Sequence, residues 1–119
     1  MSKSFTVLVA GGRGFSNMAR VYRELDGIHK NSPISRIVTG GASGADLLAG
    51  KWARHSAVTL VQVFPDWLVY GKAAGPIRNK EMFDEYPPDL VVVFPGGVGT
   101  ADCVSRARDL NVPVQEVLT

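Results

Sequence analysis

Five short runs of branched and aromatic residues alternate along the chain with segments in which apolar residues recur every three or four positions. The runs are typical of buried strands, and the three-to-four spacing is typical of helices with one apolar face. The pattern predicts strands at residues 5–10, 37–39, 58–64, 89–94 and 112–117, and helices at 17–30, 45–53, 77–86 and 98–110. Pro76 is expected near the start of the third helix, where the backbone N–H that proline lacks would have no partner within the helix.

Strands that alternate with helices and are apolar on both faces indicate an α/β fold with a parallel sheet covered on both sides. Right-handed crossovers then predict a Rossmann-like three-layer sandwich with five parallel strands in the order 3-2-1-4-5. Pro113 lies in the last strand, which places that strand at an edge of the sheet.

Glycine clusters follow three of the predicted strands, at residues 11–14, 40–46 and 96–100. A single cluster of this kind is usually a tight turn that tolerates positive φ angles. Three strand exits in one parallel sheet, however, are expected at the same edge, where helix N-termini offer free N–H groups to an anion. The pattern therefore predicts a site for a phosphorylated ligand, between the exits of the first and fourth strands.

Composition narrows the class of protein. The 119 residues are 45% hydrophobic with a formal net charge of +2, which indicates one globular domain over residues 1–119 and makes nucleic-acid coating unlikely. The only cysteine is Cys103, and no long apolar segment begins the chain, so we expect a cytoplasmic protein that does not act at a membrane. His29 and His55 have no neighbouring ligands at metal-binding spacing, so neither a metal nor a cofactor is predicted.

One connection, residues 65–75, is longer than usual for such a fold. It can act as a lid in which Tyr70 or Trp67 stacks on a base while Lys72 reaches a phosphate, and of the two aromatics we favour Tyr70. The alternative is that the aromatics pack over the sheet edge or against a second subunit.

Common fingerprints of other enzymes are absent. Asn17 stands where a dinucleotide-binding loop needs its third glycine, and neither Gly50-Lys51-Trp52 nor Gly71-Lys72-Ala73 closes a kinase-type phosphate loop. Ser43 lacks the spacing of a nucleophile elbow and is better interpreted as a hydroxyl that donates to phosphate. ATP hydrolysis and ordinary NAD-dependent redox chemistry are therefore not expected.

Three segments, residues 38–46, 74–82 and 94–102, together resemble the small YspA-type branch of the SLOG superfamily. That superfamily includes the LOG enzymes, which hydrolyse the N-glycosidic bond of nucleoside monophosphates, the DprA-type DNA-processing proteins, and sensors of nucleotide derivatives. The resemblance implies a Rossmann-like fold, a nucleotide-type ligand and, from the LOG-like relatives, a homodimer.

The chain matches only part of the sequence motifs of the LOG enzymes. Residues 95–100 fit the phosphate-holding part of the LOG motif, but Cys103 stands at the position of its catalytic glutamate. Asp102 lies one residue earlier, about a hundred degrees around a helix, so it does not simply replace that glutamate. Arg78 matches the arginine of a second LOG motif, whose lysine is Asn79 here. Phosphate or ribose binding by Arg78 therefore agrees with the resemblance better than hydrolysis does.

The candidate site follows from these observations. Main-chain N–H groups of residues 97–100 and the Thr100 hydroxyl would hold a phosphate, and Arg13 and Arg78 would flank it. For Asp46 capping is favoured over recognition of a ribose hydroxyl, which stays open, and for Asp102 neither interpretation is preferred. The predicted ligand-binding residues are Gly11, Gly12, Arg13, Gly41, Ser43, Gly44, Asp46, Tyr70, Lys72, Arg78, Asn79, Gly96, Gly97, Val98, Gly99 and Thr100, with Asp102 and Arg78 catalytic only in an enzyme.

Three functions remain open. We favour a module that senses or sequesters a nucleotide or an ADP-ribose-like molecule, since the phosphate loop is present and the glutamate is absent. The first alternative is a nucleoside 5'-monophosphate N-glycosidase. The second is a DprA-like binder of single-stranded DNA, for which a net charge of +2 scarcely supplies a basic groove.

Overall fold

The computed structural model describes residues 4–118, which form five strands arranged in a single sheet. The strands are β1 (Thr6–Ala10), β2 (Arg36–Thr39), β3 (Thr59–Gln62), β4 (Leu90–Val93) and β5 (Val114–Glu116). All neighbouring pairs are parallel, and the order is β3-β2-β1-β4-β5. The predicted fold class and strand order are therefore confirmed.

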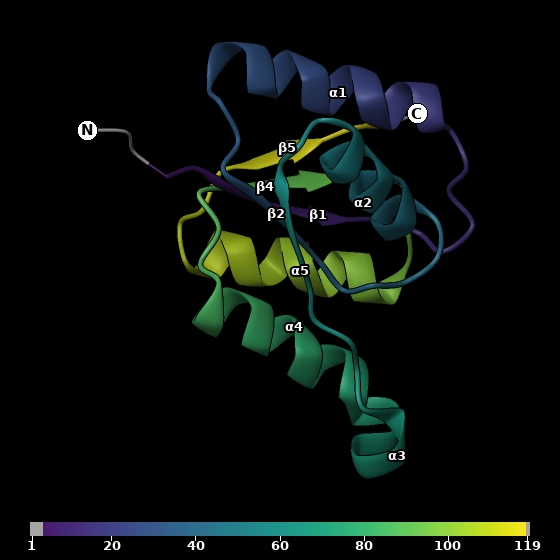
Figure 1. The fold of residues 1–119 in the computed structure, drawn as a ribbon. Coiled ribbons are helices and arrows are strands. Elements are labelled where there is room, and N and C mark those ends of the chain that lie inside the picture. Colours follow the sequence, from purple (N-terminus) through teal and green to yellow (C-terminus); the bar gives the residue numbers. More distant parts are fainter. Residues whose placement is uncertain (1–3, 119) are drawn as a thin grey trace.

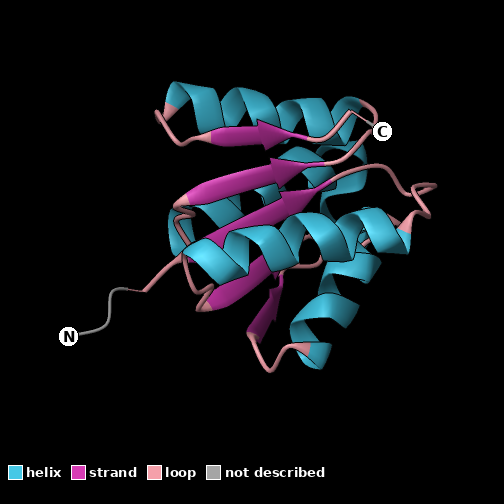
Figure 2. Cartoon of the chain, turned by 90° about the horizontal axis from the view of Figure 1, so that it is seen from above, coloured by secondary structure: helices cyan, strands magenta, loops and turns pink. Residues whose placement is uncertain are grey.

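The helices lie in two layers, one on each face of the sheet (Figure 1). Helices α1 (Met18–Asn31) and α2 (Ala45–His55) pack together on one face, and α4 (Ala74–Glu85) and α5 (Val98–Asp109) on the other. Seen from above, the strands run in a common direction and twist across the molecule (Figure 2). Every residue of β1 is buried, as expected for a central strand covered on both faces.

Two apolar clusters hold the layers to the sheet. Trp52 of α2 is fully buried in the first cluster. Its Nε1 donates a 2.8 Å hydrogen bond to Asp26 of α1. On the opposite face, Met82 of α4 and Val104 of α5 pack against the other sides of the central strands. Within the described residues, no helix combines the length and apolarity that crossing a membrane requires.

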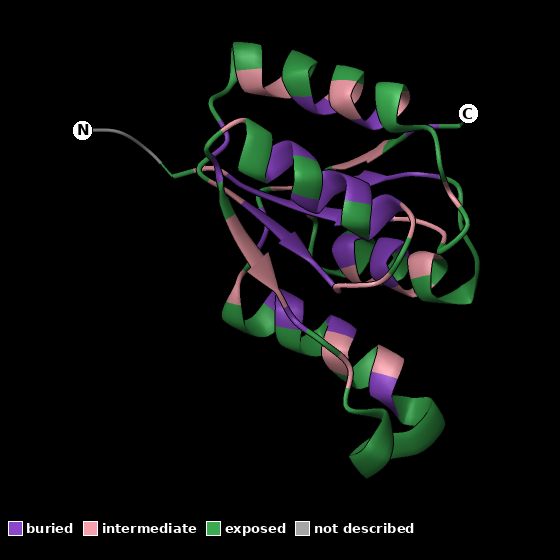
Figure 3. Cartoon of the chain, turned by 45° about the vertical axis from the view of Figure 1, so that its right-hand side comes forward, coloured by how far each residue is buried: buried purple, intermediate pink, exposed green. Residues whose placement is uncertain are grey.

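The long connection after β3 contains helical structure that the pattern did not predict. Its residues form a short helix, α3 (Trp67–Tyr70), and a 3-10 turn, η1 (Gly71–Ala73), which leads directly into α4. Asp66 caps α3 by accepting a 3.1 Å hydrogen bond from Val69 N. Helix α4 consequently begins at Ala74, so Pro76 lies within its first turn, a position that proline tolerates. None of the α3 residues is buried, and the helix projects from the body of the molecule (Figure 3).

Candidate functional site

The carboxyl ends of β1, β2 and β4 bring the three glycine-rich loops together. Gly12 N donates a 2.8 Å hydrogen bond to Pro95 O in the loop after β4. Gly12 O accepts a 3.2 Å hydrogen bond from Ala45 N at the start of α2. The loop after β1 is thus bonded to both of its neighbours, as expected where parallel strands end at one edge.

The glycines of these loops have two different roles. A Cβ at Gly12 would lie 2.8 Å from Pro95 O, and one at Gly96 would collide with Thr100 Oγ1 and with the loop after β1. Gly44 has a φ of 76°, and its Cβ would meet Gly12 O. By contrast, a Cβ at Gly97 or Gly99 would meet nothing within 4 Å. The first group allows the loops to pack on one another, whereas the second leaves open space beside α5.

A cavity of about 480 Å³ opens at this edge of the sheet. A second cavity, of about 370 Å³, adjoins it and shares Arg13, Trp67 and Arg78 with it. The predicted residues that line the first are Gly11, Gly12, Arg13, Asp46, Lys72, Arg78, Asn79, Gly97, Val98, Gly99, Thr100 and Asp102, and the second adds Gly41 and Ser43. Both volumes are in the range of ligand pockets.

Three of the predicted residues line neither of these cavities. Gly44 is the N-cap of α2 and packs under Gly12, and Tyr70 lies at the end of α3 with its side chain half-exposed. Gly96 lines a different and larger hollow of about 640 Å³ on the other side of α5, next to Arg108 and Glu116. We place the candidate site in the two smaller cavities, because Arg13 and Lys72, which make no ion pair within residues 4–118, lie there together with the N-terminus of α5.

The N-terminus of α5 forms one wall of the first cavity. Gly97 is its N-cap, no side chain caps it, and its first turn contains no acidic residue. The first N–H groups of such a helix have no partner within the helix, so those of Val98, Gly99 and Thr100 are available at its end. Val98 is 89% exposed, which leaves this end open to an incoming ligand. The helix dipole there favours an anion.

Three cationic side chains line the cavities, and they differ in how they are held. Nη1 of Arg78 donates a 2.6 Å hydrogen bond to Gly40 O, and its Nε donates one of 2.9 Å to Asn79 Oδ1. Arg78 therefore fixes the loop after β2 as well as contributing charge. Within residues 4–118, the charged groups of Arg13 and Lys72 make no ion pair, and the Arg13 guanidinium lies 5.8 Å from the centre of the Trp67 ring.

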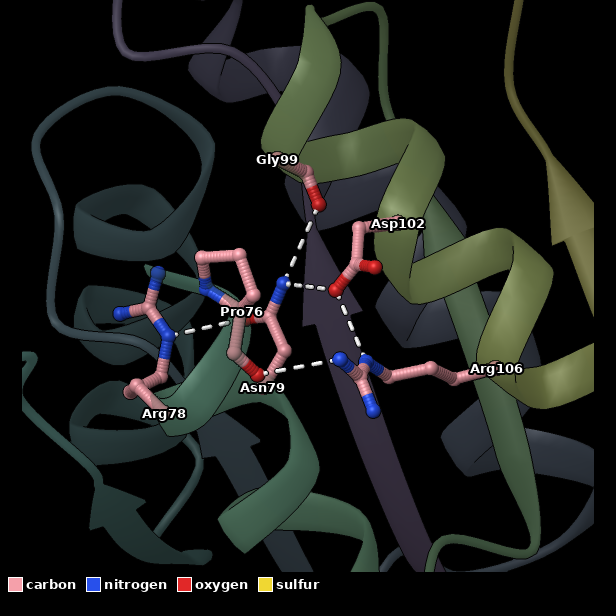
Figure 4. Close-up of polar contacts among 6 residues, drawn as sticks. All are labelled: Pro76, Arg78, Asn79, Gly99, Asp102 and Arg106. Atoms are coloured by element: carbon pink, nitrogen blue, oxygen red, sulfur yellow. Dashed lines mark hydrogen bonds and ion pairs between the residues drawn. The ribbon is translucent and has the colours of Figure 1, made fainter. Parts of the chain in front are cut away.

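Asp102 belongs to a polar network that joins α4 to α5 (Figure 4). Its Oδ2 accepts hydrogen bonds from Asn79 Nδ2 (2.9 Å) and from Arg106 Nε (2.8 Å). Asn79 is nearly fully buried, and its Nδ2 also donates to Gly99 O at 3.3 Å. Partial burial works to raise the pKa of Asp102, but the hydrogen bonds from Arg106 and Asn79 and the Arg106 charge outweigh it, so the pKa lies below its usual range.

This network corrects the capping interpretation of Asp102 and shows how Asn79 is held. The capping interpretation of Asp102 is wrong, because its carboxylate bonds side chains of α4 and α5 and makes no cap to the end of its own helix. Asn79, predicted to bind ligand, has its amide engaged by Arg78, Gly99 and Asp102, although it also lines the cavity. Both side chains therefore position the end of α5 against α4.

Asp46 lies in the first turn of α2, as predicted, where a carboxylate favours the helix dipole, but its side chain makes no hydrogen-bonded cap to that helix. Gly44 caps α2 without a side-chain hydrogen bond. The Asp46 carboxylate instead reaches back to the loop after β2, where Oδ2 accepts from Gly40 N at 3.1 Å and from Ala42 N at 3.3 Å. Burial raises its pKa to about 6, against the lowering effects of these N–H groups and of the Arg78 and Arg13 charges.

Cys103 lies in the wall of the first cavity, on the opposite side of α5 from solvent. Its side chain is 3% exposed, and burial raises the pKa of the thiol to about 12. A neutral thiol of this kind is not a nucleophile at neutral pH.

Sequence reasoning ranked one side chain of the site too low and missed another. Trp67, rather than the favoured Tyr70, lines both cavities, and the short helix that carries both residues was not predicted. Arg106 is the ion-pair partner of Asp102. Its position four residues later on a predicted helix was a usable signal, since side chains four apart on a helix are neighbours.

Comparisons with known proteins agree with this architecture. The model of the YspA, cpYpsA-related SLOG family matches residues 5–70. The chain is 35% identical over 116 residues to the gene 61 protein of Mycobacterium phage D29, an alignment that covers 91% of this chain and 92% of that protein.

Two solved structures have the same fold at low identity. DNA processing protein A (DprA) from Streptococcus pneumoniae superposes with a TM-score of 0.76 at 20% identity, over 98% of this chain and 51% of that one. The chain thus spans about half the length of that structure. The molybdenum cofactor binding protein from Rippkaea orientalis superposes with a TM-score of 0.70 at 18% identity, over 98% of this chain and 77% of that one.

Proposed function

Because the chain belongs to the YspA, cpYpsA-related SLOG family, we propose that it binds a phosphorylated, nucleotide-type ligand at the carboxyl edge of its sheet. The family resemblance supports a nucleotide-type ligand, and the geometry of the edge supports a phosphate. We further propose that residues 1–119 are a single ligand-binding domain that senses or sequesters this molecule.

The observation that carries the proposal is the meeting of a free helix N-terminus with unpaired cations in one cavity. The N–H groups at the start of α5 and the charged groups of Arg13 and Lys72 line the same space of about 480 Å³. A phosphate held by the N–H groups would gain charge-assisted hydrogen bonds from the cations. The empty space beside Gly97 and Gly99 allows its oxygens to approach the main chain closely.

The same geometry favours binding over hydrolysis. Asp102 is the carboxylate nearest in sequence to the expected glutamate, and its Oδ2 is already shared between Asn79 and Arg106. Cys103, at the glutamate position itself, is a buried neutral thiol. The site thus retains the parts that hold a phosphate and lacks a free carboxylate at the catalytic position.

Isothermal titration calorimetry with a panel of nucleoside mono- and diphosphates and ADP-ribose tests the proposal. We expect binding of at least one member, weakened about tenfold or more in Lys72→Ala and strongly reduced at high salt. Lys51→Ala is the matched control, because Lys51 is an exposed lysine of α2 that lines neither cavity. Absence of binding across the whole panel would refute the proposal.

A second candidate function is hydrolysis of an N-glycosidic bond, favoured by the presence of two carboxyl groups in one cavity. Burial raises the pKa of Asp46 to about 6, whereas the pKa of Asp102 is lowered. Two carboxyl groups whose pKa values differ in this way can take two different roles. The one with the raised pKa, Asp46, can protonate the leaving base, and the one with the lowered pKa, Asp102, can stabilise an oxocarbenium-like transition state as an anion. Water would then complete the reaction, giving free base and ribose 5-phosphate.

Chromatographic detection of free base from nucleoside monophosphates distinguishes the two functions. Release that is abolished in Asp102→Asn and retained in Asp109→Asn, an exposed aspartate at the far end of α5, would establish hydrolysis. Binding without release would leave the sensing function as the answer. DNA binding of the DprA type has no comparable support here, since the likeness to DprA is one of fold.

We also propose a homodimer in the cytoplasm, as the LOG resemblance and the free, buried Cys103 suggest. The surface that suits a second subunit is α3, where Leu68 is 100% exposed and Val69 is 67% exposed. Sedimentation equilibrium of the wild type and of Leu68→Glu tests this: a dimer that dissociates in the variant is expected, and a monomeric wild type would contradict it.

A further inference from the structure

The two cavities of the candidate site differ in chemistry. Both are lined by Arg13 and Arg78, but the first adds the N-terminus of α5 and Lys72, whereas the second adds Phe64 and Pro65. Trp67 lies on the boundary, because its side chain lines both. A molecule that occupied both cavities could therefore place an anionic group at the N-terminus of α5 and a flat ring against the aromatic side chains of the second cavity.

The aromatic side chains of the second cavity are exposed to an unusual degree. Phe64 is 63% exposed and Trp67 is 48% exposed, although each has an apolar ring that burial would stabilise. The Phe64 ring rests on Gly41, whose φ is 71° and whose Cβ would collide with the ring. The rest of the ring remains open to the cavity, so a second flat group can pack there.

Trp67 is positioned by its neighbours on two sides. Its Cη2 lies 3.7 Å from where a Cβ of Gly75 would stand, at the start of α4. The Arg13 guanidinium lies over the ring, 5.8 Å from its centre. This is the geometry of a cation–π contact, which at an exposed site is weak enough for another flat group to replace. The indole therefore presents a partly exposed face over which the Arg13 guanidinium lies.

We propose that the second cavity is a nucleobase subsite in which Trp67 stacks on the base of the ligand. The base takes the place of the Arg13 guanidinium on the indole, and Arg13, which also lines the first cavity, turns to the phosphate. Every base has a flat face, so stacking gives affinity with little sequence preference. This inference rests on the proposed nucleotide site and adds where the base lies and which side chain holds it.

The two tryptophans make the inference testable by fluorescence. Trp52 is fully buried with its Nε1 bonded to Asp26, so acrylamide reaches it poorly, whereas Trp67 is exposed. Ribose 5-phosphate and AMP serve as probes with and without a base. We expect AMP, but not ribose 5-phosphate, to protect the exposed tryptophan from quenching, and AMP to bind about tenfold more tightly.

Variants of Trp67 test whether its side chain causes the difference in affinity between AMP and ribose 5-phosphate. Trp67→Ala is expected to bind AMP only as tightly as ribose 5-phosphate, and Trp67→Phe to recover most of the difference. Leu110→Ala is the matched control, since it truncates an exposed apolar side chain at the end of α5 that lines neither cavity. Circular dichroism verifies that α4 and the sheet are intact in each variant.

The outcomes separate this inference from the function on which it rests. Equal affinity of the wild type for the two probes, or an equal loss of both in Trp67→Ala, would overturn the base subsite while leaving phosphate binding in place. Failure of both probes and of the wider nucleotide panel would remove the phosphate site and the inference together.

Discussion

Replacement of Asp46 by asparagine is expected to stabilise the protein at neutral pH. The Asp46 carboxylate is 6% exposed and accepts hydrogen bonds from the N–H groups of Gly40 and Ala42. An asparagine Oδ1 has the same shape and can accept both bonds without carrying a buried charge. The substitution therefore removes the cost of ionisation and keeps the contacts that organise the loop.

The magnitude follows from the pKa. The value for Asp46 rises from 3.8 to about 6 on folding, mainly because burial disfavours the charged form. A group whose pKa is higher in the folded state holds its proton more tightly there, so the folded protein loses stability as the pH rises from about 4 through about 6. At about 1.4 kcal/mol per pH unit, the loss amounts to about 3 kcal/mol above that range.

Urea unfolding at pH values from 4 to 7.5 measures this directly. The free energies of unfolding of the wild type and Asp46→Asn should be similar near pH 4, and the variant should become more stable by up to about 3 kcal/mol above pH 6.5. Asp109→Asn is the control, because Asp109 is exposed and makes no contact with the loop after β2. A difference that stays constant or reverses with pH would refute the reasoning, since it would mean that attraction to Arg78 and Arg13 outweighs burial.

Two further predictions concern residues of the same edge. Gly96→Ala should lower the free energy of unfolding by about 1 to 3 kcal/mol in urea titrations, because its Cβ would collide with Thr100 and the loop after β1. Gly99→Ala should leave the free energy of unfolding unchanged or raise it slightly. It should nevertheless weaken nucleotide binding, because its methyl group would stand in the open space beside the helix N-terminus. Equal destabilisation by Gly96→Ala and Gly99→Ala would contradict the roles assigned to the two glycines. Cys103 should resist iodoacetamide at pH 8 in the folded protein and react in urea, as mass spectrometry can establish, because burial raises its pKa to about 12; rapid labelling of the folded protein would disprove this.

The order of the sheet could be predicted because each central strand is apolar along its whole length. β1 is buried at every position and β4 at nearly every position, which only a sheet covered on both faces permits. The connection after β3 could not be predicted in the same way. α3 has four residues and no buried side chain, so it leaves no apolar periodicity, and a single cap at Asp66 holds it.

The meeting of the glycine loops could also be predicted, since parallel strands end at one edge. The role of each glycine could not, because it depends on what lies opposite. Gly12 and Gly96 face each other's main chains, whereas Gly99 faces open space, and all three occur in similar glycine-rich stretches. Likewise, the sequence places Asp46 in the first turn of a helix, but the direction in which its carboxylate turns follows from the path of the preceding loop.

The bonds among the loops have a consequence for how a ligand is bound. Gly12 joins the loops after β1 and β4, Asp46 holds the loop after β2, and Asn79 fixes the end of α5 through Gly99 O. The donors for a phosphate are thus in place before the ligand arrives, and binding there costs little ordering of the main chain. Arg13 and Lys72 are the parts left unbonded, so the cost of binding falls on two side chains. The phosphate binding that we propose would therefore not depend on a carboxylate at position 103, because none of these bonds involves that side chain.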